Sequence, residues 1–111
     1  MKYNVNKRSL KELIKAECLD YFRREEELKN ADLPRRVRME YAYLDSKIED
    51  AVRSVVGDKL CLAFIFEIGE GIGYAKSDVY CYSERIYKEK KRECVIRIAE
   101  KLYLAPPSLR D

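Results

Sequence analysis

Five basic side chains that could bind an anion lie close together in the C-terminal third of this chain. The segment CYSERIYKEKKRE, from Cys81 to Glu93, contains five basic residues, two tyrosines and a helix-start serine. Lysine and arginine bind phosphates and guanine edges through charge and hydrogen bonds. The segment therefore predicts either a surface that binds a polyanion or a solvated helix, in which Glu89 and Glu93 would neutralise much of the charge.

Catalytic and metal chemistry have little support in the composition. The chain has no histidine, the commonest general base near neutral pH and the commonest metal ligand. The glycine cluster Gly69–Gly73 lacks the preceding strand and the following Lys-Ser/Thr of a P-loop. We expect no enzyme, no cofactor and no metal. The cysteines are too widely spaced for a disulfide framework or a zinc site, which predicts reduced, mostly buried thiols at Cys18, Cys61, Cys81 and Cys94.

Length and charge indicate one small domain. A chain of 111 residues can bury one modest core. Charged residues make up 39% of the chain, but the net charge is only +3, so the distribution of charge matters more than its sum. The longest apolar run, Leu60–Phe66, is too short to span a bilayer. We expect a soluble, cytoplasmic protein with no membrane partner.

Apolar residues recur at three- and four-residue steps, which predicts helices. A capping box at Ser9–Glu12 predicts that the first helix begins there, and its apolar stripe continues to about Lys29. This helix fits a core-facing arm and a dimerising helix equally well. Asp32 is expected to cap a second helix, with Pro34 in its first turn, and this helix runs to about Val56.

Three further helical segments are expected after Gly57. The segment Lys59–Ile68 is apolar nearly all round, so it should be the most buried element, and its flanking caps favour a helix over a strand. After the glycine-rich connection, a short helix from about Tyr74 to Cys81 and a long one from Ser83 to about Tyr103 follow. The prediction is an all-α fold of about five helices, with an N-terminal arm (1–33) and a helical domain (34–111).

The last three segments have the order of a helix-turn-helix, at about residues 59–104. In that motif the first turns of the second helix enter the major groove, and Ser83 would open this helix. We expect base readout by Arg85, Lys88 and Arg92. Phosphate contacts are expected from Arg35, Arg36, Lys76 and Lys91. Symmetric operators favour dimers, so we expect a homodimer formed through the first or the second helix.

The segment YSERIYKEKKRECVIRIAEKL, Tyr82 to Leu102, resembles the C-terminal signature of small phage transcriptional regulators of the RinA and ArpU type. The shared pattern is Ser-Glu-Arg, an aromatic residue, a Lys/Arg pair and an apolar run that closes on Ile-Ala-Glu-x-Leu. Here the chain has Ser83-Glu84-Arg85, Tyr87, Lys90-Lys91 and Ile98-Ala99-Glu100-Lys101-Leu102. It departs from the pattern at Lys76, where the family has an apolar residue, and at Cys81, where the family has Gly or Asn.

The resemblance implies a helix-turn-helix similar to that of sigma factors, in a protein that activates late phage genes for packaging and lysis. The implied partner is double-stranded DNA in the cytoplasm of a bacterial host. The family's functional residues would correspond to Ser83, Arg85, Tyr87, Lys90 and Lys91, although Tyr87 is expected to pack inward.

Two other functions remain open at this point. A protein-interaction module, such as an inhibitor or adaptor of the transcription machinery, would contact RNA polymerase or another transcription protein through aromatic side chains, because tyrosine is enriched at interfaces. A phage packaging subunit is a related possibility. The tyrosines concerned are Tyr41, Tyr43, Tyr74, Tyr80 and Tyr82. The sequence favours a sequence-specific DNA-binding transcriptional regulator of phage or prophage late genes.

Overall fold

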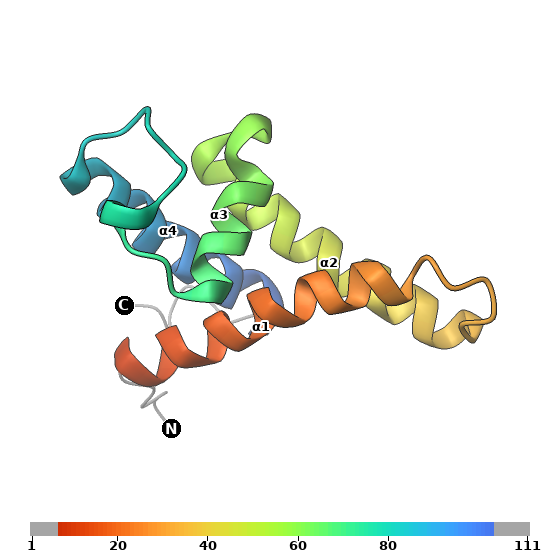
Figure 1. The fold of residues 1–111 in the computed structure, drawn as a ribbon. Helices are drawn as coiled ribbons and strands as arrows, with labels where there is room; N and C mark the ends of the chain where they lie inside the picture. The colour runs from red at the N-terminus through yellow and green to blue at the C-terminus, as the bar shows by residue number, and fades with distance from the viewer. Residues whose placement is uncertain (1–6, 104–111) are drawn as a thin grey trace, which may run out of the picture.

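The computed structural model describes residues 7–103 as an all-helical unit with no strand in that range. The helices are α1 (Lys7–Glu27), α2 (Arg35–Val56), α3 (Asp58–Glu70) and α4 (Glu84–Tyr103). A single turn of 3₁₀ helix, η1 (Tyr74–Lys76), lies between α3 and α4. The helices α1 and α2 form a long hairpin, α3 packs against both of them, and α4 packs mainly on α2 (Figure 1).

One core joins all four helices. The buried apolar residues of α1, α2 and α4 recur at helical spacing along one side of each helix, and α1 contributes to the core as fully as the later helices do. Cys18, Cys61 and Cys94 are buried, as predicted for most of the cysteines, whereas Cys81 is exposed. The buried apolar side chains are Ile14, Cys18 and Tyr21 on α1, Ile48, Ala51 and Val52 on α2, Cys61, Phe64, Ile65 and Ile68 on α3, Val79 in the connection, and Tyr87, Cys94 and Ile98 on α4.

Two predicted helix starts are wrong. The chain is already helical at Lys7, so Ser9 lies inside α1 and does not cap it. At α2, Pro34 occupies the position before the helix and Asp32 does not cap it; the Asp32 N–H instead donates to the Asn30 side chain at 2.9 Å. Arg38 of α2 stabilises the turn between α1 and α2, because its guanidinium donates hydrogen bonds to the Leu28 and Asn30 carbonyls at 2.8 and 2.6 Å.

The predicted short helix at Tyr74–Cys81 is also wrong. Only η1 is helical there, and the chain from Ser77 to Ser83 is irregular. The fold therefore has four α-helices and one 3₁₀ turn in the described range, where about five helices were expected. The expected bracing helix of a helix-turn-helix is reduced to this one turn.

The helix α3 is less completely buried than its apolar sequence predicts. Six of its residues are buried, but Leu62 is 55% exposed and Phe66 is 46% exposed. These two side chains lie one turn apart, so they share a face of the helix. An apolar face of α3 is therefore left uncovered by the rest of the described helices.

Gly69 lies where α1 and α3 approach closely. A Cβ added at Gly69 would lie 3.1 Å from the Leu19 nitrogen and 3.2 Å from the Cys18 carbonyl carbon. Because both neighbours are backbone atoms, a larger side chain would force the two helices apart. We expect Gly69→Leu to lower the free energy of unfolding by about 2 kcal/mol in urea titrations.

Gly73 provides the matched control for that variant. No atom of the described residues lies within 4 Å of a Cβ added at Gly73, which is exposed. Gly73→Leu should change the free energy of unfolding by less than about 0.5 kcal/mol. Equal losses for the two variants would contradict the close approach at Gly69.

None of the helices described within residues 7–103 is both long and apolar enough to cross a membrane.

Candidate nucleic-acid interface

Ser83 opens α4 as the sequence predicts. Its Oγ accepts a hydrogen bond from the Ile86 N–H at 3.3 Å, and its carbonyl accepts one from the Tyr87 N–H at 2.8 Å. A serine in this position satisfies one of the amides that a helix start leaves without a partner. Glu84 follows in the first turn, where a carboxylate interacts favourably with the helix dipole.

The helix α4 has a buried side and a basic exposed side. Tyr87 is buried, whereas Arg85, Lys88 and Arg92 are exposed on the outward side. Arg85 lies 2.9 Å from Glu89, and Lys88 lies 2.8 Å from Glu84. Both pairs are solvent-exposed, and such pairs contribute little free energy. Arg85 and Lys88 can therefore exchange these carboxylates for phosphates at small cost.

A groove of about 850 Å³ separates the N-terminal halves of α1 and α4. Its apolar wall includes Leu10, Ile68 and Val95. Five cationic side chains line it against one carboxylate, that of Glu12. The cations come from two helices that are far apart in the sequence: Lys11 and Lys15 from α1, and Lys88, Lys91 and Arg92 from α4.

The lysines of the groove lie close enough to repel one another. Burial and the ammonium of Lys11 lower the pKa of Lys91 below its ordinary value of 10.5; Lys15 adds to this shift and Glu67 opposes it. The Nζ of Lys15 would lie 3.0 Å from a Cβ added at Gly71, so the end of this lysine side chain lies against the glycine-rich connection. Concentrated positive charge of this kind attracts anions.

Lys91 differs from the other predicted DNA-binding residues. It is half-buried, its Nζ donates to the Ile72 carbonyl, and it lies 5.6 Å from the centre of the Tyr87 ring. Its ammonium therefore already has partners within the protein. A phosphate contact by Lys91 stays a prediction.

The connection before α4 is held by a buried carboxylate on α3. Glu67 is 3% exposed and accepts hydrogen bonds from the Ser77 and Tyr87 hydroxyls at 2.7 and 2.6 Å. It also accepts one from the Asp78 N–H at 2.9 Å. Because these donors come from both the connection and α4, Glu67 fixes where α4 begins relative to α3.

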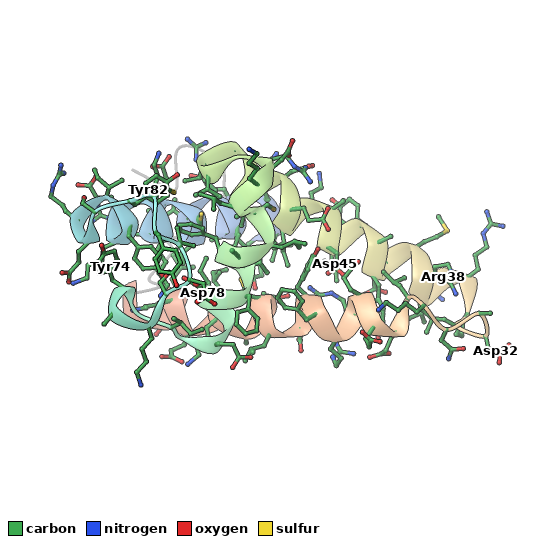
Figure 2. The ribbon with its side chains drawn as sticks, turned by 45° about the horizontal axis from the view of Figure 1, so that its top comes forward. Asp32, Arg38, Asp45, Tyr74, Asp78 and Tyr82 are labelled. Carbon is green, nitrogen blue, oxygen red and sulfur yellow. The ribbon has the colours of Figure 1, made fainter. Side chains whose placement is uncertain are left out.

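Arg35 and Arg36 do not join the basic surface of α4. They lie in the first turn of α2, between Asp32 and Arg38, and Figure 2 places that turn at the opposite end of the molecule from Tyr82. Lys76 lies on η1 at the same end as Tyr82 and is exposed. Of the four residues predicted to contact phosphates, Arg35 and Arg36 therefore lie away from the start of α4.

The tyrosines of the predicted aromatic surface are also separated. Tyr43 and Tyr80 are exposed at 55% and 85%, but they lie on α2 and in the connection respectively. Tyr74 and Tyr82 are half-buried, and their rings pack on Tyr87 and Phe64 at 5.6 and 6.2 Å. These tyrosines do not form one continuous surface.

Lys11 and Lys15 are candidate binding residues that the sequence reading missed. Their four-residue spacing places them on one side of α1, which was the available signal. The sequence does not say that this side faces α4.

Within the described residues, no group of three or more His, Cys, Asp or Glu side chains could hold a metal ion.

Comparisons of the chain with models of protein families, with curated proteins and with solved structures find no match.

Proposed function

We propose that this protein binds double-stranded DNA through the first turns of α4 and the basic groove beside it. The observation that carries this proposal is the convergence of five cations and one carboxylate on the groove, beside the exposed start of α4. Arg85, Lys88 and Arg92 would contact bases or phosphates, and Lys11 would contact phosphates. Lys76, at the same end of the molecule, would extend the contact.

The proposed role is that of a transcriptional regulator of phage or prophage late genes. It is supported by the resemblance of Tyr82–Leu102 to the RinA and ArpU type of regulator and by the serine cap that opens α4. The DNA contact proposed here differs from a standard helix-turn-helix, because η1 replaces the bracing helix. The backbone contacts that such a helix makes would come instead from α1, through Lys11.

Salt dependence of duplex binding tests this proposal. Fluorescence anisotropy with a labelled duplex should give an affinity that falls steeply as salt increases, because phosphate contacts release counterions. The Lys88→Ala/Arg92→Ala variant should bind about tenfold to a hundredfold more weakly, and its salt slope should fall by about two. The absence of duplex binding by the wild type at low salt would sink the proposal.

A matched variant controls for net charge. Lys47→Ala/Lys59→Ala removes the same charge from α2 and from the first turn of α3, outside the residues that line the groove. It should keep its affinity within about twofold, because distant charges are screened at moderate salt. Equal weakening by both double variants would show that binding reflects total charge and not this surface.

A further inference from the structure

The helices α1 and α3 share an exposed apolar face that the other described residues do not cover. Leu62 and Phe66 of α3 are 55% and 46% exposed, and Leu19 of α1 is 44% exposed. The Phe66 ring packs edge-on against Phe22 of α1 at 6.0 Å between ring centres, which joins the two helices into one surface. We call Leu19, Phe22, Leu62 and Phe66 the α1–α3 face. Contiguous apolar surface of this kind marks interaction sites.

A regular stripe of side chains runs along α1 through this face. Its positions are separated by alternating steps of three and four residues, which is the spacing of a helix–helix seam. All six positions are accessible to solvent: Lys15 and Phe22 are half-buried and the other four are exposed. The stripe reads Glu12, Lys15, Leu19, Phe22, Glu26 and Lys29, the last in the turn that follows α1.

This stripe is complementary to itself in the antiparallel direction. A second copy of α1 can be placed antiparallel to the first, centred on the midpoint between Leu19 and Phe22. Each acidic residue of the stripe then faces a basic residue of the other copy, and the apolar residues face each other. A two-fold axis repeats each contact twice, as in all isologous interfaces. The resulting pairs are Glu12 with Lys29, Lys15 with Glu26, and Leu19 with Phe22.

We propose that two copies of this chain associate as an antiparallel, two-fold-symmetric dimer through the α1–α3 face. The complementary partner for the stripe is the stripe itself, which favours a second copy over an unrelated protein. Within one chain, Glu26 and Lys29 lie 3.3 Å apart, but both are about three-quarters exposed, at 75% and 72%. Such a pair is weak and can be replaced by pairs across the dimer. The α1 helix thus contributes both to the core and to dimer formation.

Solution mass, measured without DNA, tests this proposal independently of the proposed function. Wild-type protein should sediment at twice the mass of one chain, and Leu19→Asp should sediment as a folded monomer, because it places a charge at the apolar centre. The helical circular dichroism of Leu19→Asp confirms that it folds. A wild type that stays monomeric at the highest soluble concentration overturns the proposal, as does an unchanged dimer in folded Leu19→Asp.

Charge reversal tests the antiparallel register. Lys15→Glu and Glu26→Lys should each weaken dimer formation about tenfold, because each creates two like-charge pairs by symmetry. An equimolar mixture of the two variants should recover wild-type affinity, since a heterodimer restores both opposite-charge pairs. Glu40→Lys, at an exposed position on α2, is the control and should dimerise like the wild type. Failure of the mixture to recover affinity would overturn the proposed register.

Discussion

Asp45→Leu is expected to lower the free energy of unfolding by about 4 kcal/mol, as measured by urea denaturation near pH 7. Asp45 and Arg24 are buried between α1 and α2, at 2% and 3% exposure, and the Arg24 Nε donates to the carboxylate at 2.7 Å (Figure 2). Without Asp45, the ion pair that remains to the guanidinium among residues 7–103 is the one with the partly buried Glu17, at 3.6 Å. An ion left in the interior without its counter-ion accounts for most of the expected loss.

The double variant Arg24→Leu/Asp45→Leu should recover most of that stability. Among the described residues, Arg24 Nη2 and Asp45 Oδ2 have no hydrogen-bond partner, so the pair does not fully offset the cost of its own burial. Replacing both ions with apolar side chains should bring the free energy of unfolding to within about 1 kcal/mol of wild type or above it. Asp50→Leu removes an exposed carboxylate from the same helix and should change stability by less than about 1 kcal/mol. A loss for Asp45→Leu no larger than that of Asp50→Leu would contradict this account.

The same pair predicts a pH dependence. Burial, followed by the neighbouring Glu25 carboxylate, raises the pKa of Asp45 above its ordinary value of 3.8, against the opposing effect of Arg24. The folded state then binds the proton more tightly than the unfolded state does. The contribution of this group to stability is present below its ordinary pKa and is lost as the pH rises through the raised value. The free energy of unfolding of the wild type should therefore decline relative to that of the double variant as the pH rises from about 4.

Glu67→Ala is expected to lower the free energy of unfolding by about 3 kcal/mol. The substitution removes the carboxylate that accepts hydrogen bonds from the Ser77 and Tyr87 hydroxyls and from the Asp78 N–H, and it leaves these donors buried or partly buried without that acceptor. Hydrogen bonds to a charged acceptor are among the stronger ones in proteins. Hydrogen exchange should report the effect locally, because the Asp78 amide loses its partner and should exchange faster than in the wild type.

Glu70→Ala is the matched control for Glu67. Glu70 lies on the same helix and is exposed, so its removal should change stability by less than about 0.5 kcal/mol.

Burial alone would raise the pKa of Glu67, but hydrogen bonds from Tyr87, Ser77 and the Asp78 backbone together lower it below its ordinary value of 4.5. The contribution of Glu67 is therefore present above about 4.5 and lost as the pH falls through the lowered pKa. If Glu67→Ala keeps the acid sensitivity of the wild type, Glu67 is not its source.

Local signals in the sequence predict the ends of several helices closely. The apolar stripe of α2 ends at Val56, before a glycine with φ of +85°, and the serine cap places the start of α4 directly after Ser83. These features depend on residues within a few positions of one another, which is why they can be read from the chain alone. The predicted starts of α1 and α2 are wrong because the capping box at Ser9–Glu12, and Asp32 followed two residues later by Pro34, indicate where a helix can begin and not where it must begin.

The connection before α4 shows the limit of such reading. Nothing in Tyr74–Cys81 forbids a helix, but Glu67 of α3 accepts hydrogen bonds from the Ser77 side chain and the Asp78 backbone. This contact spans ten residues of sequence and takes the Asp78 amide out of a helical pattern. A buried acceptor on another element therefore decided the conformation of the segment.

The sequence by itself determined the all-α class, the inward position of Tyr87 and the basic outward side of α4, because periodicity and capping are local. Only the tertiary structure decided which basic residues share a surface. It brings Lys11 and Lys15 to α4 and leaves Arg35 and Arg36 at the far end of the α1–α2 hairpin. It also decided which side of α3 stays exposed, because packing on α1 and α2 covers only part of a helix that is apolar nearly all round.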